Sequence, residues 1–136
     1  MSNDIVLKNV TQSNIKTIIT DDTSAETLVT CAKTIGKHLV NSRLTTNQIR
    51  AIFGEVRRIE GNWNINSQRA SRNLILLKPK MAYRAKKERG QGVQDLVKVL
   101  DPAIDHVGED QDNFQRFVDF FEAILAYHKF HGGRET

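Results

Sequence analysis

The chain has 136 residues, 39% of them hydrophobic and 26% charged, which suits one folded domain and excludes collagen-like, mucin-like and wholly disordered classes. Its net charge is +4. Its one cysteine, Cys31, excludes an internal disulfide and a multi-cysteine metal site. No apolar run reaches the roughly 18 residues that cross a bilayer. Because the N-terminus also lacks a signal-peptide pattern, these features predict a cytoplasmic protein that contacts no membrane.

The N-terminal segment carries the weakest structural signal. Apolar residues occur within residues 1–22, but no period holds, so this segment is predicted to be a weakly ordered arm. Residues 23–136 carry repeated helical signals with short connections, and they predict a single helical-bundle domain. The first helix is expected over about 24–41, after the capping-box spacing of Thr23 and Glu26.

The middle of the chain predicts two further helices. Thr45 begins a second capping-box pattern ahead of an apolar stripe, and the helix that follows is expected to end at a polar loop, residues 61–67, which carries Trp63. The next helix, over about 67–78, is expected to break or kink at Pro79, because proline lacks a backbone donor and clashes with the preceding turn.

Two helices are predicted in the C-terminal third. Apolar residues from Val93 to Val107 follow helical spacing, and a wider stripe from Phe114 to His128 follows Asp112, a residue suited to an N-cap. With the helices of the middle segment, this pattern predicts an all-α fold, a compact bundle of five to six helices.

Charge is segregated along this helical pattern. Residues 33–90 hold fourteen basic and three acidic residues, a net charge of +11, whereas residues 1–32 carry −2 and residues 91–136 carry −5. A concentrated positive field attracts polyanions, and nucleic acid is the commonest large one. The segregation favours a nucleic-acid surface, and pairing of the acidic third with the basic middle is the alternative.

The basic middle contains two groups of candidate phosphate contacts. On a helical wheel, Arg50 and Arg57 lie about 20° apart and away from the apolar stripe. Residues 78–89 hold six basic residues and Tyr83, whose ring offers a stacking surface for an unpaired base. A solvated face is the alternative for both groups. The candidate residues are Arg50, Arg57, Lys78, Lys80, Tyr83, Arg84 and Lys87.

The sequence contains no recognisable catalytic constellation. It lacks a glycine-rich phosphate loop and a Gly-x-Ser-x-Gly elbow. The pair Asp105 and His106, and the pair His128 and His131, each supply too few ligands for a metal site. We therefore expect a protein that is not an enzyme and that holds no metal and no cofactor.

Three blocks of sequence occur in order along the chain: LTTNQIR at 44–50, LLKPKMAY at 76–83 and FFEAILAYHKFHGG at 120–133. Together they resemble the small subunit of type III-A CRISPR effector complexes, and the second block is the most specific. Of the candidate cations, Arg50, Lys78 and Lys80 match a block directly, whereas Arg57 and Arg84 depend on helical spacing.

The resemblance implies a function and a set of partners. Small subunits of this kind are all-helical and non-catalytic, and several copies stack beside the backbone subunits to help hold the guide RNA and the captured single-stranded target RNA. The expected partners are therefore both RNAs, the backbone and large subunits, and further copies of the chain. Charge segregation also suggests a head-to-tail contact between an acidic end and the basic middle of the next copy.

Other functions fit parts of the sequence. A free-standing helical nucleic-acid-binding regulator is the main alternative, although the loop after Glu60 is long for a helix-turn-helix motif. A protein adaptor whose basic segment meets an acidic partner protein is a further alternative. A small hydrolase is disfavoured because the acid–base constellation is missing.

Overall fold

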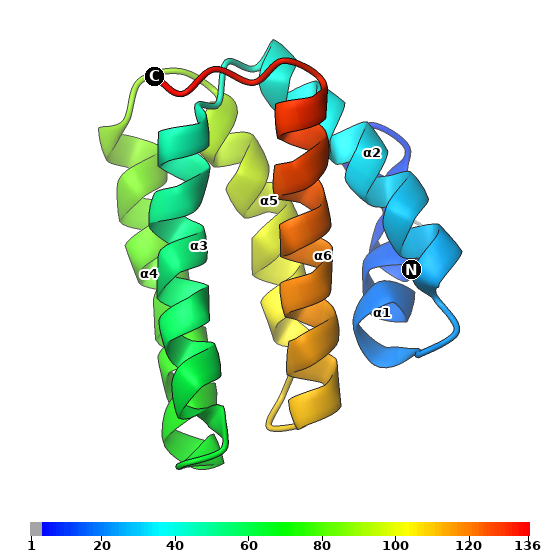
Figure 1. Ribbon diagram of the computed structural model, residues 1–136, viewed down its shortest axis with the longest axis vertical. Coiled ribbons are helices and arrows are strands. Elements are labelled where there is room, and N and C mark those ends of the chain that lie inside the picture. The colour runs from blue at the N-terminus through cyan, green and yellow to red at the C-terminus, as the bar shows by residue number, and fades with distance from the viewer. Residues whose placement is uncertain (1–3) are drawn as a thin grey trace.

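The computed structural model describes residues 4–136, which form a small hairpin followed by six helices (Figure 1). The predicted fold class, an all-α compact bundle of five to six helices, is confirmed. Residues 1–3 of the expected arm lie outside the described residues. The elements are β1 (Ile5–Leu7), β2 (Val10–Thr11), α1 (Gln12–Thr20), α2 (Ala25–Asn41), α3 (Thr46–Trp63), α4 (Ser67–Lys87), α5 (Gly92–Asp105) and α6 (Gln111–Phe130).

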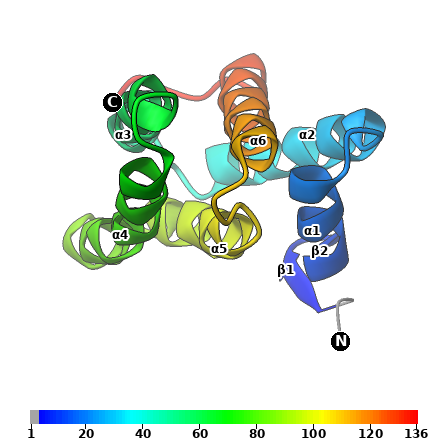
Figure 2. The same cartoon turned by 90° about the horizontal axis from the view of Figure 1, so that it is seen from below.

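Helix α6 is the centre of the bundle. It packs against α1, α2 and α3, while α4 packs between α3 and α5 on the far side of the molecule from α1 and α2 (Figure 2). Phe114, Phe117 and Phe121 of α6 are each no more than 2% exposed, so aromatic side chains fill the core. This arrangement leaves the outer sides of α3 and α4 free to face solvent.

Helix α2 approaches α6 unusually closely at one glycine. A Cβ atom at Gly36 would lie 2.7 Å from the Tyr127 Cβ and 2.8 Å from the His128 backbone nitrogen. Only a residue without a side chain fits between the two backbones there. The close contact fixes the C-terminal half of α6, and with it the end of the chain.

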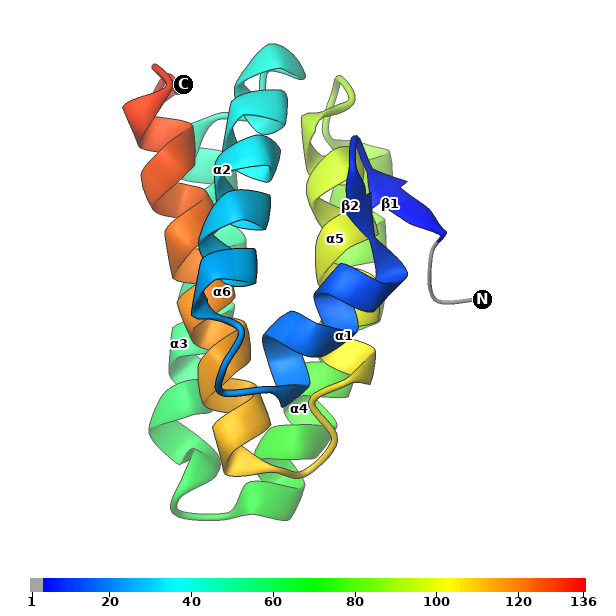
Figure 3. The same ribbon diagram turned by 90° about the vertical axis from the view of Figure 1, so that its right-hand side faces the viewer.

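The N-terminal segment differs from the weakly ordered arm expected there. Residues 5–11 form an antiparallel hairpin, and α1 follows with a capping box between Thr11 and Asn14. Ile15, Ile18 and Ile19 of α1 are fully buried, and the segment lies beside α5 and α2 (Figure 3). The helix has only nine residues, so its apolar face is too short to show a period in the sequence.

Helix α3 extends further than the sequence pattern predicted. It includes Trp63, which was expected in a polar loop but is only 3% exposed and stacks on Phe114 with ring centroids 4.4 Å apart. The prediction of a loop at this residue was wrong. Ile52, Val56 and Trp63 fall on one helical face, so the extra half turn brings the indole into the core.

Helix α4 continues without interruption through Pro79, where a break or kink was predicted. Proline removes the hydrogen bond to the carbonyl of Ile75, four residues earlier. Both residues lie on the exposed side of the helix, so water can satisfy that carbonyl. The continuous helix places the basic residues after Pro79 on the same rod as the buried residues before it.

The helix ends test the predicted caps. The capping box of Thr45 and Gln48 is confirmed, since both reciprocal hydrogen bonds are present at 2.9 and 3.1 Å. The N-cap of α6 is Asp110, whose carboxylate accepts from the Asn113 amide, and not the predicted Asp112. The first predicted box is absent, because Ser24 is the N-cap of α2.

His128 makes the stability of the bundle depend on pH. Its ring is fully buried, and Nε2–H donates to the Leu44 carbonyl at 2.6 Å. Burial, aided by the charge of Lys129, lowers the pKa of His128 below its ordinary value of 6.5, although the Leu44 hydrogen bond opposes this shift. Below pH 6.5, His128 is protonated in the unfolded chain but stays neutral in the folded chain. The folded state therefore loses stability as the pH falls.

We expect the free energy of unfolding to fall by up to about 1.4 kcal/mol per pH unit below about pH 6.5, until the folded His128 itself is protonated. Urea titrations at several pH values measure this slope. His128→Gln keeps a donor but cannot titrate, so its slope should be smaller than that of the wild type. His106→Gln, a change at a partly exposed histidine, is the matched control and should retain the wild-type slope. Equal slopes for wild type and His128→Gln would contradict the assignment.

Candidate nucleic-acid interface

The structure distributes the seven candidate residues over three places. Four of them, Lys80, Tyr83, Arg84 and Lys87, line a single groove between α3 and α4. Arg50 and Arg57 lie on α3, roughly 130° around that helix from its buried stripe, and Lys78 lies between α4 and α5. The helix packing therefore brings together only the α4 group.

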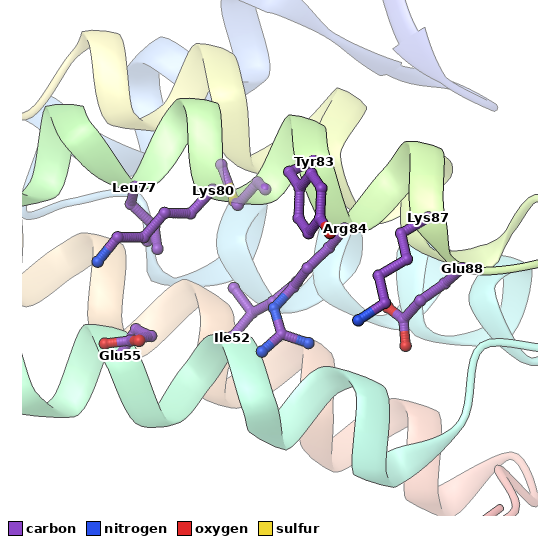
Figure 4. Close-up of a pocket in the computed structure, with 9 residues that line it drawn as sticks. Ile52, Glu55, Leu77, Lys80, Tyr83, Arg84, Lys87 and Glu88 are labelled. Carbon is purple, nitrogen blue, oxygen red and sulfur yellow. The ribbon is translucent and has the colours of Figure 1, made fainter.

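The groove has a volume of about 400 Å³ and runs between the antiparallel helices α3 and α4 (Figure 4). Lys80, Arg84 and Lys87 point from α4 toward α3. They occupy positions i, i+4 and i+7, so they share one side of the helix and span about 10.5 Å along its axis. Tyr83 stands beside them and is 66% exposed, with the Lys87 ammonium 5.9 Å from its ring centroid.

The three groove cations differ from the other candidates in their pairing. Within the described residues, Lys80, Arg84 and Lys87 make no ion pair. An unpaired cation keeps its full charge available to an anion from outside the chain. The α4 side of the groove is thus the strongest free positive surface among the seven candidates.

Arg50 and Arg57 are both held by carboxylates of the same chain. Arg57 pairs with Glu60 at 2.8 Å and lies over the Phe53 ring, while Arg50 lies 3.7 Å from Glu135. Glu135 reaches Arg50 because the C-terminal tail crosses the start of α3, where its carbonyls accept from the Thr46 and Asn47 amides. A phosphate at Arg50 or Arg57 has to compete with these carboxylates.

The carboxylate of Glu135 is stabilised in its charged form by two cations. A hydrogen bond from Lys129 at 3.1 Å, reinforced by the charges of Lys129 and Arg50, lowers the pKa of Glu135. Both members of each pair are more than half exposed, so these pairs contribute little to folding stability. Their main effect is to reduce the net positive charge at the start of α3.

Lys78 is held against α5. Its ammonium group contacts Asp101 at 3.3 Å and also contacts Asp105. Partial burial works against the charged form, but the hydrogen bonds to Asp105 and Asp101 outweigh it and raise the pKa of Lys78. This residue therefore joins α4 to α5, and its charge is neutralised within the chain. For Lys78 the acidic third of the chain pairs with the basic middle, which was the alternative to a nucleic-acid surface.

A family model described as Csm2 Type III-A matches residues 22–134. The chain belongs to the Csm2 family. This match confirms the resemblance seen in the three sequence blocks and covers all seven candidate residues. The search of curated proteins and the search of solved structures each find no match.

Membership of the Csm2 family makes the chain a subunit of a type III-A CRISPR effector complex, a ribonucleoprotein assembly. Csm2 proteins are its structural small subunits. In the part of the chain that the structure covers, no helix is both long enough and apolar enough to cross a membrane, and no three His, Cys, Asp or Glu side chains gather as metal ligands.

Sequence reasoning missed part of the groove in this Csm2 chain. Its apolar floor consists of Ile52, Leu77 and Met81, and its two ends carry Glu55 and Glu88. The floor residues read as ordinary core positions, since each is no more than 3% exposed. No local signal identifies the acidic pair, because they come from different helices that only the tertiary packing joins.

Proposed function

We propose that this chain is a non-catalytic, RNA-binding structural subunit of the cytoplasmic type III-A CRISPR ribonucleoprotein, stacking in several copies along the guide and target RNA. Its contacts are to the phosphate backbone, so binding is insensitive to sequence at most positions and falls steeply with salt. Its protein partners are the backbone subunits, the large subunit and further copies of itself.

The observation that carries the proposal is the row of unpaired cations on α4. Lys80, Arg84 and Lys87 span about 10.5 Å of helix axis, enough to contact successive phosphates of a single strand. The exposed ring of Tyr83 beside them suits an unpaired base, which a duplex would not offer. A single-stranded ligand fits this surface better than a duplex does.

A tagged pull-down from the native host tests the proposal. We expect CRISPR effector subunits to be recovered together with repeat-containing guide RNA. Recovery of the chain alone, or with duplex DNA, would favour the free-standing regulator instead. Ribonuclease treatment separates RNA binding from a protein adaptor, because an adaptor keeps its partners after the RNA is digested.

Stacking of copies is proposed to use acidic residues of α6. Asp119 and Glu122 are exposed, and neither forms an ion pair with any residue from 4 to 136. They can therefore meet the basic middle of a neighbouring copy in a head-to-tail contact, which repeats without closing.

We expect Asp119→Lys with Glu122→Lys to abolish salt-sensitive self-association and to lower the number of copies per complex. Sedimentation at low and high salt measures the first effect, and the subunit ratio of the purified complex measures the second. Glu109→Lys with Asp112→Lys, just before and within the first turn of α6, makes the same charge change and is the control. Unchanged association and stoichiometry in the Asp119/Glu122 variant would end the head-to-tail model.

A further inference from the structure

The α3–α4 groove combines three chemical features, and a phosphate contact needs only one of them, the cations. Its floor is apolar and is formed by Ile52, Leu77 and Met81. Its rim carries cations along the α4 side, and its volume of about 400 Å³ lies within the range of small-molecule sites. A flat ring with an attached anion matches this combination, with the ring on the floor and the anion at the rim.

The third feature is a carboxylate oxygen without a donor. Glu88 follows the last turn of α4, and its Oε1 accepts from the Gln48 amide at 3.5 Å. Its Oε2 is buried and has no hydrogen-bond partner within residues 4–136. An acceptor left in this state is costly, so the site favours a ligand that brings an N–H group.

The other acidic residue of the groove, Glu55, has a charged donor within the chain. Glu55 accepts from the Arg58 guanidinium at 2.6 Å through Oε2. Figure 4 shows Glu55 and Glu88 at opposite ends of the groove, with Arg84 and Tyr83 between them. The two carboxylates therefore differ in what they can offer a ligand, although they have the same charge.

Building on the proposed function, we propose that this groove is a nucleotide subsite that takes one unstacked base of the bound RNA and prefers a base with an exocyclic amine. The base lies on the apolar floor beside Tyr83. The flanking phosphates meet Lys80, Arg84 and Lys87. The amine donates to Glu88 Oε2. An acidic peptide could supply anions for the cations of the rim. It has no flat ring whose amine would donate to Glu88 from the floor of the groove, so a nucleotide fits the groove better.

Cytosine and uracil provide a matched pair of ligands for this site. The N4 amine of cytosine is a two-proton donor that a carboxylate can accept from. Uracil has the acceptor O4 at that position. The one N–H group of the uracil ring lies between two carbonyl oxygens, and the negative charge of a carboxylate repels both of these oxygens. Both bases have the same ring size, so the floor and the phosphate contacts treat them alike.

The test compares short cytidine and uridine oligomers of equal length, binding to the full chain at neutral pH by fluorescence anisotropy. We expect cytidine oligomers to bind about tenfold more tightly, the value of one hydrogen bond to a charged acceptor. Glu88→Gln should reduce this ratio to about one, because the amide can turn to present either a donor or an acceptor. Glu55→Gln makes the same charge change in the same groove and should leave the ratio unchanged. Circular dichroism confirms that both variants fold.

The outcomes separate this inference from the proposed function. Equal binding of the two oligomers by the wild type overturns the base subsite and leaves phosphate-based RNA binding in place. A ratio altered equally by Glu88→Gln and Glu55→Gln also overturns it, since charge alone would then explain the preference. Absence of binding to either oligomer overturns the proposed function. Poly-glutamate that displaces the cytidine oligomer at equal concentration would assign the groove to an acidic protein partner.

Discussion

Replacing Trp63 with alanine is expected to lower the free energy of unfolding by about 3–5 kcal/mol. The indole is 3% exposed and stacks on Phe114 with the ring planes 10° apart, so its removal leaves a cavity between α3 and α6. Urea denaturation followed by circular dichroism measures the loss. Because Trp63 is the only tryptophan, its blue-shifted emission in the folded wild type checks its burial independently.

Phe130→Ala is the matched control for this experiment. It also removes an aromatic side chain from a helix end, but Phe130 is 74% exposed, and we expect a change within about 0.5 kcal/mol. If Trp63→Ala does not fold, Trp63→Phe retains an aromatic ring and should show a smaller loss. A loss below about 1 kcal/mol for Trp63→Ala would place the side chain in an exposed loop and contradict the structure.

Removing the three groove cations is expected to weaken RNA binding most strongly. Each phosphate contact contributes about 0.7 to the slope of log affinity against log salt for a single strand, so Lys80→Ala, Arg84→Ala and Lys87→Ala together should lower the slope by about 2. The affinity at physiological salt should fall about a hundredfold. Titrations of a short RNA at several salt concentrations measure both quantities.

Two comparisons make this result specific. Lys16→Ala, Lys33→Ala and Lys37→Ala remove the same charge from exposed positions on α1 and α2, on the far side of α6, and should leave the slope nearly unchanged. Arg50→Ala with Arg57→Ala should flatten the slope less than the groove variant, because both arginines already pair with carboxylates. A groove variant with the wild-type slope would remove α4 from the RNA-binding surface.

The sequence predicted the helices wherever an apolar stripe was long and a cap stood before it. Helices α2, α3 and α6 begin close to their predicted positions, and the Thr45 capping box is present. The errors lie where local rules compete with packing. Pro79 remains within α4 because it lies on the solvent-exposed side of that helix. Trp63 is buried because it stacks on Phe114, a residue distant in the sequence.

The family assignment was also accessible from the sequence, because it depends on short blocks whose residues are adjacent along the chain. The composition of the binding surface was accessible only in part. The density of basic residues in 78–89 indicated α4, but Lys78 and Lys80 are two residues apart and lie on opposite flanks of that helix. Sequence proximity cannot separate them, because the rotation of the helix against its neighbours decides which flank is free.

By itself, the sequence determined the helical class, the basic middle of the chain and the family, since each follows from local periodicity, composition or contiguous motifs. Only the tertiary structure decided which cations remain free. Asp101, Asp105 and Glu135 come from distant segments and neutralise Lys78 and Arg50, whereas no carboxylate of the described residues forms an ion pair with Lys80, Arg84 or Lys87. The physical reason is that Coulomb pairing acts across a few ångströms in space, and the packing of α3, α4 and α5 sets those distances.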